Sequence, residues 1–269
     1  MKDAYVHGYD VRENTRLRDQ ACTLTELLHS DTAFPKNSRV LEAGCGVGSQ
    51  TVILAKKSPR AHITSFDISE TSIKAARERV AAAGLTNVRF EQGNIYHPRF
   101  GPGSFDHVFV CFVLEHLARP LEALLSLKNL LREGGTITII EGDHGSAYFH
   151  PDSEAAHDAI QCLVELQRRG GGNAMIGREL HPLLCAAGFH GVRVSPRMVY
   201  ADANRPDLVD GFTRKTFTAM IEGVRDAATT AGLIDPTAFD AGIRDLYRTA
   251  ETGGVFCYTF FKAFGTKGR

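Results

Sequence analysis

The stretch Val40-Leu41-Glu42-Ala43-Gly44-Cys45-Gly46-Val47-Gly48 decides the fold. Its first residues have the apolar character of a buried strand, and they run directly into a turn that contains three glycines. Residues 50–57 then show the pattern of a helix. Glycine turns tightly and lets a ligand approach the main chain. A strand, a glycine-rich turn and a helix in this order predict the start of a Rossmann-like unit with a ligand at the turn.

The same alternation of short apolar runs and amphipathic stretches continues to about residue 141. It predicts further strands at residues 61–66, 88–92, 107–112 and 136–141, and helices at 69–83 and 121–131. Strict alternation of strand and helix indicates a parallel sheet with helices on both faces.

The rest of the chain is less regular. Helical patterns occupy residues 153–168 and 177–187, and residues 192–200 and 255–264 predict a sixth and a seventh strand. Helical patterning fills the residues between these two strands, around 208–228 and 238–249, where a hairpin needs only a few residues. We interpret the excess as an insertion that forms a lid.

The chain is therefore predicted to be an α/β protein with a Rossmann-like, seven-stranded, mostly parallel sheet, helices on both faces and a helical lid insertion. Residues 1–35 are expected to form an N-terminal cap segment, with a helix at roughly 13–28. Residues 36–269 form one domain, with helical insertions at about 148–178 and 202–252.

Composition excludes several classes of function. Lys plus Arg equals Asp plus Glu at 31 each and no basic run is present, so nucleic acid is not expected as a partner. No apolar stretch approaches the length of a membrane span and the N-terminus lacks a signal sequence, which predicts a cytoplasmic protein without membrane contact. The cysteines lie singly and indicate reduced, mostly buried thiols; they are Cys22, Cys45, Cys111, Cys162, Cys185 and Cys257.

Two acidic residues indicate the charge of the ligand. Glu42 precedes the first glycine, where a carboxylate would repel a pyrophosphate but favour a cationic sulfonium with a free amino group. Asp67 ends the second predicted strand, about 20 residues after the glycines, where a carboxylate can accept both hydroxyls of an adenosine ribose.

Residues 36–142 resemble the class I S-adenosylmethionine-dependent methyltransferases, in particular the small-molecule branch with the ubiquinone/menaquinone and sterol-type enzymes. The resemblance places the family's glycine motif on residues 42–48, its ribose acid on Asp67 and its adenine-edge motif on Gly93-Asn94-Ile95. Asn94 departs from the family's usual Asp, although its side-chain oxygen can still accept a hydrogen bond from adenine.

The resemblance implies S-adenosylmethionine as cofactor, S-adenosylhomocysteine as product and a small-molecule acceptor. The segment 111–117 corresponds to the family's motif at the methionine end of the cofactor, and in relatives an N-terminal aromatic residue folds over the same end. The implied cofactor contacts are Tyr9, Glu42, Gly44, Cys45, Gly46, Asp67, Ile68, Asn94, Ile95, Phe112 and His116. Two of these cofactor contacts have an open alternative. Tyr9 could instead belong to a terminus without a defined fold, and His116 could instead be a residue at the start of a helix.

The segment after the fifth strand carries the residues that we expect on the acceptor side. Residues 141–150 contain two acids, two histidines and a tyrosine beside glycines that permit a turn. We interpret Glu141, His144 and Tyr148 as acceptor-side residues, with His144 or Glu141 as general base. A polar surface loop is the alternative. No metal site is predicted, because the histidines lack zinc-ligand spacing.

Two groups of apolar residues have two interpretations. Phe212, Phe217 and Met220 in the insertion, with Met198 and Tyr200 on the sixth strand, either line an apolar acceptor pocket or pack a core.

The sequence predicts an enzyme that methylates a small, aromatic or heterocyclic acceptor at N, O or C, as a monomer or a homo-oligomer. The alternatives are an enzyme that couples methylation to cyclisation, a protein or RNA methyltransferase, and a non-catalytic cofactor-binding subunit.

Overall fold

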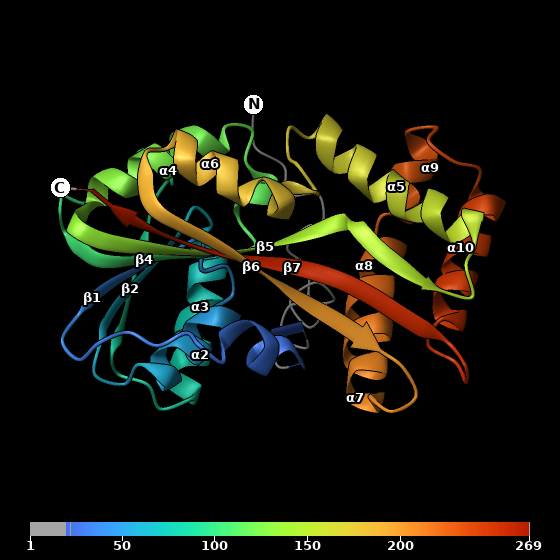
Figure 1. The fold of residues 1–269 in the computed structure, drawn as a ribbon, viewed down its shortest axis with the longest axis horizontal. Helices are drawn as coiled ribbons and strands as arrows, with labels where there is room; N and C mark the ends of the chain where they lie inside the picture. Colours follow the sequence, from blue (N-terminus) through green and yellow to red (C-terminus); the bar gives the residue numbers. More distant parts are fainter. Residues whose placement is uncertain (1–19, 22, 269) are drawn as a thin grey trace.

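A computed structural model describes residues 20, 21 and 23–268, so the predicted contact Tyr9 lies outside the described residues. Seven strands form one sheet in the order β3-β2-β1-β4-β5-β7-β6 (Figure 1). Strands β1 to β5 pair in parallel, whereas β7 lies antiparallel between β5 and β6. The predicted Rossmann-like, mostly parallel sheet is thereby confirmed. The strands are β1 Arg39–Ala43, β2 His62–Asp67, β3 Val88–Gln92, β4 Phe105–Cys111, β5 Leu131–His150, β6 Phe189–Ala201 and β7 Val255–Lys267.

Helices cover both faces of the sheet, as the continuously apolar strands predict. Helices α2 (Ser49–Lys57) and α3 (Glu70–Ala82) lie on one side, and α4 (Pro120–Leu130) and α6 (Leu180–Ala186) on the other (Figure 1). Neighbouring residues of a strand point to opposite faces. Val40 accordingly packs into the core cluster that contains residues of α2, while Leu41 packs into the cluster that contains residues of α4 and α6.

The helix α3 shows how closely the local signals set an element's ends. The Ser69 side chain accepts a hydrogen bond from the Ser72 backbone N–H and caps the first turn. Gly84 follows the last turn with a φ of 68°, a conformation that glycine adopts without strain. The predicted helix at 69–83 thus differs by one residue at each end.

The expected loop after the fifth strand was wrong, because β5 continues to His150. Its far half pairs with β7, Tyr148 opposite Cys257 and His150 opposite Val255, after a break in register between Asp143 and Tyr148. The glycines here serve close packing instead of a turn. A Cβ on Gly142 would collide with the Tyr258 hydroxyl.

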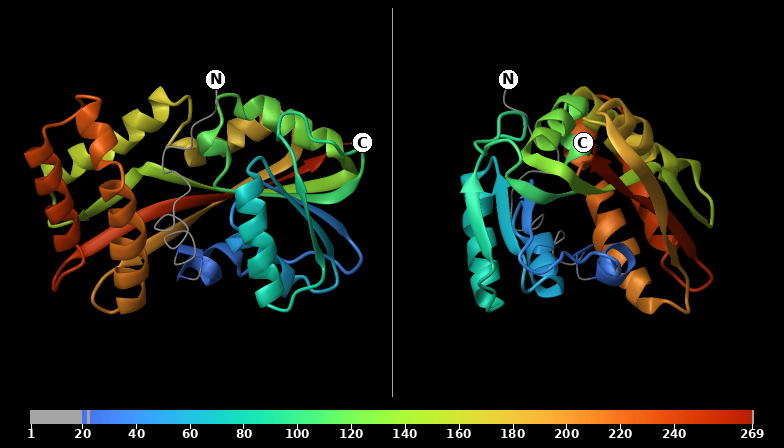
Figure 2. Two further views of the ribbon diagram at one scale, coloured as in Figure 1. Left: turned by 180° about the vertical axis from the view of Figure 1, so that it is seen from behind. Right: turned by 60° about the vertical axis from the view of Figure 1, so that its left-hand side comes forward.

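The residues between β6 and β7 fold as helices, as predicted, and pack with the helix that follows β5. The first of them, α7 and η3, lie on the same side of the sheet as α2 (Figure 2). Helix α10 packs along α5, where a Cβ on Gly242 would clash with the Ala155 carbonyl oxygen. The elements are α5 Glu154–Arg169, η2 Ile176–Glu179, α7 Pro206–Leu208, the π-helix η3 Val209–Thr218, α8 Ala219–Glu222, α9 Arg225–Thr230 and α10 Pro236–Arg248. Among the described helices, none combines the length and apolar character that a membrane crossing needs.

Candidate functional site

The three glycines after β1 have different structural roles. All adopt positive φ, 75° at Gly44, 49° at Gly46 and 79° at Gly48. A Cβ would lie 2.5 Å from Val113 at Gly44 and 2.8 Å from Ala76 at Gly48, so both glycines allow close packing within the protein. At Gly46 a Cβ would meet no atom of the described residues within 4 Å. Gly46 therefore exposes main chain to open space, as a ligand-binding turn requires.

Glu42 holds this turn from beneath. Its Oε2 accepts hydrogen bonds from the Thr51 hydroxyl of α2 and the Ser65 hydroxyl of β2, both at 2.6 Å. Burial raises the pKa of Glu42 to about 7, the two hydroxyls oppose the rise, and the nearby Asp67 carboxylate adds to it. The side chain is 2% exposed. The bonds from Thr51 and Ser65 make Glu42 a support for the turn. Its role as an electrostatic partner of the cation stays a prediction.

Asp67 lies beside the open glycine. Its Oδ2 accepts from the Gly46 N–H at 2.8 Å, and its Oδ1 accepts from the Ser69 N–H at 2.9 Å. Burial raises the pKa of Asp67, and these backbone N–H groups oppose the rise. The next side chain, Ile68, is 59% exposed although it is apolar. The structure thus brings together an acceptor for hydroxyls, an exposed apolar surface and open main chain.

The remaining predicted contacts on this side complete the rim. The Gly93 N–H donates to the Asp67 carbonyl oxygen at 3.0 Å, which joins the ends of β2 and β3. The Asn94 side-chain oxygen accepts from the Tyr96 N–H at 2.9 Å and so closes a local turn. Ile95 and Cys45 are buried. Burial also raises the pKa of the Cys45 thiol, which keeps it uncharged.

The end of β4 is a strained turn. Phe112 has a φ of 57°, the left-handed region that a bulky residue rarely adopts. Its N–H donates to the Ile140 carbonyl oxygen at 2.9 Å, and its ring lies 5.5 Å from that of Phe260. Such a conformation costs on the order of 1–3 kcal/mol and persists where the surroundings hold it.

Glu141 of β5 helps to stabilise the turn after β4. Its Oε1 accepts from the N–H groups of Val113 and Leu114, at 3.0 and 2.8 Å, at the start of the short helix η1 (Leu114–His116). The side chain is fully buried, and its Oε2 has no hydrogen-bond partner among the described residues. Burial, followed by the charge of Glu115, raises the pKa of Glu141 well above its usual range.

His116 lies at the end of η1, with its Nε2 3.5 Å from a carboxylate oxygen of Glu115. The Glu115 carbonyl oxygen in turn accepts from the Gln167 side chain of α5 at 2.9 Å and from the Asn173 N–H at 2.8 Å. The turn after β4 is therefore tied to the helix that follows β5.

His144 lies where β5 and β7 lose register. Its Nδ1 is 2.6 Å from the Tyr258 hydroxyl, and its ring meets Phe217 of η3 edge-on at 6.2 Å. Glu141 contacts η1 instead, so these two candidates for a base do not form a pair. Sequence reasoning missed Tyr258, because nothing near it in the chain distinguishes it from a core tyrosine.

The prediction that Tyr148 joins these residues finds no support in its position. Tyr148 is 55% exposed and its hydroxyl lies 3.5 Å from the Met198 sulfur. Met198 and Tyr200 are also exposed, whereas Phe212, Phe217 and Met220 are buried in the core. Because strand residues alternate between faces, the extension of β5 sends Tyr148 to the face opposite Phe149. The five apolar residues therefore form no common pocket.

Comparison with known proteins decides the family. The profile of a family described as "Methyltransferase domain" matches residues 35–188. An uncharacterised 37.1 kDa protein in transposon TN4556 of Streptomyces fradiae is 31% identical over 235 residues, 82% of this chain and 67% of that protein. The chain belongs to the methyltransferase-domain family. Methyltransferases of this class use S-adenosylmethionine.

Two further similarities are to a curated relative and to a solved structure. Demethylmenaquinone methyltransferase of Listeria monocytogenes is 32% identical over 107 residues, which are 39% of this chain and 45% of that enzyme. The structure of phosphoethanolamine N-methyltransferase 2 of Haemonchus contortus superposes with a TM-score of 0.56 at 16% identity, covering 93% of this chain and 53% of that one. The second likeness shows a shared fold. The chain spans less than half of the Listeria enzyme.

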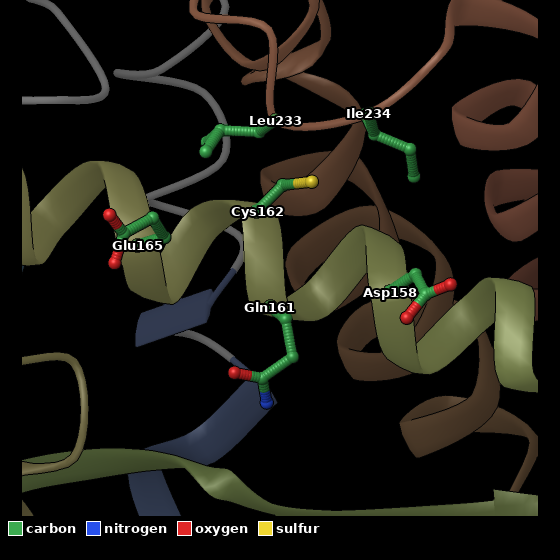
Figure 3. A pocket seen from close by; sticks show the side chains of 6 residues that line it. All are labelled: Asp158, Gln161, Cys162, Glu165, Leu233 and Ile234. Carbon is green, nitrogen blue, oxygen red and sulfur yellow. The ribbon is translucent and has the colours of Figure 1, made fainter.

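The methyltransferase also has a cavity of about 320 Å³ away from these residues. Figure 3 shows it along α5, with Leu233 and Ile234 facing it from the connection before α10. Among the predicted site residues that lie in the described part of the chain, none lines it. The lining residues are Asp158, Gln161, Cys162, Glu165, Leu233 and Ile234.

Proposed function

We propose that this chain binds S-adenosylmethionine at the ends of β1, β2 and β4 and transfers its methyl group to a small-molecule acceptor. The observation that carries the proposal is the opening at Gly46, where main chain without a side chain lies beside the Asp67 carboxylate and the exposed Ile68. An adenosine has an apolar ring and two vicinal hydroxyls, which match these two side chains.

Each group would hold one part of the cofactor. Asp67 would accept the ribose hydroxyls, Ile68 would pack on the adenine, and the strained turn at Phe112 would face the methionine end. Bound there, the sulfonium supplies an electrophilic methyl group. The chain itself contributes position, because an in-line displacement depends on holding the acceptor at the right distance and angle.

The acceptor side is assigned to the region of His144 and Phe217, since a β5 residue and the insertion meet there. The names of the relatives support a small acceptor, as a demethylmenaquinone and a phosphoethanolamine are both small molecules. The insertion, with residues 148–178, would exclude water from the site and so strengthen its electrostatic interactions. We propose it as the lid.

Calorimetry that compares the affinity of the wild type and of Gly46→Ala for S-adenosylhomocysteine tests the cofactor site. An added Cβ costs about 1–2 kcal/mol at positive φ and enters the space that the ligand needs, so the variant should fold but lose binding. Gly84→Ala is the matched control, because Gly84 also has positive φ and open space but lies at the end of α3. Equal binding by all three proteins contradicts the site.

Labelled S-adenosylmethionine with a panel of phenols, quinols, amines and heterocycles tests the reaction. Mass spectrometry then separates the alternatives. Simple methylation adds one methyl group, coupled cyclisation also changes the unsaturation of the product, and label in protein or RNA identifies a macromolecular acceptor. Binding without transfer to any acceptor in a cell extract indicates a non-catalytic subunit.

A further inference from the structure

We propose that Asn94 recognises the adenine of the cofactor as a hydrogen-bond donor, from its amide nitrogen to a ring nitrogen that flanks the adenine amino group. The sequence suggests the opposite polarity, in which the side-chain oxygen accepts from that amino group. This role rests on the proposed cofactor site, and it makes Asn94 the residue that decides which atoms of the adenine are read.

The turn that follows β3 holds the Asn94 side chain. The Asn94 carbonyl oxygen accepts from the His97 N–H at 3.0 Å, which closes a four-residue turn. The Asn94 side-chain oxygen accepts from the Tyr96 N–H at 2.9 Å and closes the same turn a second time. Asparagine and aspartate both favour this position, because their side-chain oxygen can bond to the backbone two residues on.

This contact fixes the orientation of the Asn94 amide. A backbone N–H can only donate, so the side-chain atom that faces Tyr96 is the oxygen and not the nitrogen. The nitrogen lies on the other side of the planar amide group, and it has no hydrogen-bond partner among the described residues. Because Asn94 is exposed, the two N–H bonds of this nitrogen are available to a ligand.

The two central residues of the turn are anchored in the protein. The Tyr96 carbonyl oxygen accepts from the Ser126 hydroxyl of α4 at 2.8 Å, and the Arg119 guanidinium lies 4.8 Å from the centre of the Tyr96 ring. Ile95, the other central residue, is buried. The turn therefore holds the amide in one orientation before a ligand binds, which lowers the entropic cost of binding.

Asn94 lies at the sheet edge that carries the proposed ribose and adenine contacts. The Gly93 N–H donates to the Asp67 carbonyl oxygen at 3.0 Å. The Gln92 side chain donates to the Ile68 carbonyl oxygen, also at 3.0 Å. These bonds join the end of β3 to the end of β2, and Asn94 follows directly. An adenine that packs on Ile68 with its ribose on Asp67 therefore has the Asn94 amide beside the neighbouring strand end.

Asparagine and aspartate differ here only at the atom that the turn leaves free. An aspartate would close the turn with one oxygen and present a second oxygen, which accepts from the adenine amino group. Asparagine presents N–H groups, which pair with an acceptor. The ring nitrogens N1 and N7 flank the amino group of adenine and are acceptors, so a donor at this place reads one of them.

Calorimetry on the full chain with analogues of the cofactor product tests this polarity. The ligands are S-adenosylhomocysteine, its 1-deaza and 7-deaza analogues, which each lack one ring nitrogen, and the analogue without the amino group. The wild type is compared with Asn94→Asp, which keeps the turn and exchanges the free donor for an acceptor. Asn129→Asp, the same change at an exposed residue of α4, controls for the added charge.

In the wild type, loss of one of the two ring nitrogens should raise the Kd about three- to tenfold, and loss of the amino group should raise it less than about twofold. In Asn94→Asp that ring-nitrogen penalty should disappear, and loss of the amino group should raise the Kd about tenfold or more, because the acceptor is charged. Asn129→Asp should keep the wild-type pattern.

Two results overturn this role of Asn94 while the cofactor site stands. One is a wild type that depends on the amino group and on neither ring nitrogen, and the other is the same pattern of penalties in the wild type and Asn94→Asp. If the wild type does not bind S-adenosylhomocysteine at all, the proposed function fails and the role of Asn94 fails with it.

Discussion

Replacing Asp67 with alanine should weaken cofactor binding far more than it weakens the fold. The carboxylate is the acceptor beside Gly46, and its Oδ1 and Oδ2 both lie at the edge where the ribose would bind. Hydrogen bonds to a charged acceptor contribute about 1.5–3 kcal/mol each in net terms, and water that enters the space left by the carboxylate would restore part of this for the two hydroxyls. We expect a net loss of about 2–4 kcal/mol, which is roughly a 30- to 1,000-fold increase in the Kd.

Calorimetry with S-adenosylhomocysteine measures this change directly. The same carboxylate accepts from the Gly46 and Ser69 N–H groups, so thermal unfolding of each variant must be recorded first, and binding measured well below the Tm. Asp67→Asn is the matched control. It retains one oxygen acceptor and loses the charge, so its Kd should fall between those of the wild type and the alanine variant. If Asp67→Ala is folded and binds with wild-type affinity, the ribose assignment is refuted.

Three other expectations follow from the same geometry. The pKa of Glu42 is raised from 4.5 to about 7, so the wild type loses stability as the pH rises through that range. In urea unfolding, the free energy of unfolding of Glu42→Gln should therefore rise relative to that of the wild type by up to about 3 kcal/mol between pH 5 and pH 8. Parallel pH profiles of the two proteins would contradict this. Glu141→Gln retains an acceptor for the Val113 and Leu114 N–H groups, so its kcat should exceed that of Glu141→Ala. Both variants should bind S-adenosylhomocysteine within about threefold of the wild-type affinity. Equal kcat values in the two variants would show that those hydrogen bonds do not affect turnover. Amides in residues 148–178 and 202–252 should gain hydrogen-exchange protection when S-adenosylhomocysteine and acceptor are both bound, beyond that with S-adenosylhomocysteine alone, and no gain would remove the lid proposal.

The part of the fold built from neighbouring residues was predictable. The glycine turn, the Ser69 cap and the Gly84 stop are signals within a few residues of the element they define, and each matches the structure. The extension of β5 was not predictable, because its far half exists through pairing with β7, more than 100 residues later. Polar residues and glycines in that stretch have the composition of a loop, and tertiary pairing overrides it.

The residues of the candidate site were likewise predictable only where their contacts follow from local patterns in the sequence. Asp67 and Gly46 follow strands in a recognisable order, so their meeting at one sheet edge was predictable. Tyr148 was assigned to the acceptor side because it lies near His144 in sequence, but alternation along a strand separates such neighbours. The partner of His144 is Tyr258, 114 residues away, and no pattern within one sequence indicates that contact.

Strand β5 links the two halves of the site. Glu141 reaches back to the turn after β4, on the cofactor side, while His144 contacts β7 and the insertion. Both contacts depend on the register between β5 and β7, since a shift by one residue would exchange the faces of the sheet that the side chains occupy. The break after Asp143 confines the change of register to a few residues. Glu141 upstream of it can therefore stay in the regular ladder and fix the β4 turn, while His144 departs from the ladder and meets Tyr258. An insertion or deletion within residues 144–147 would disturb the contact between His144 and Tyr258 and leave the contact of Glu141 with the β4 turn in place. A substitution at Gly142 would affect the position of the Tyr258 hydroxyl.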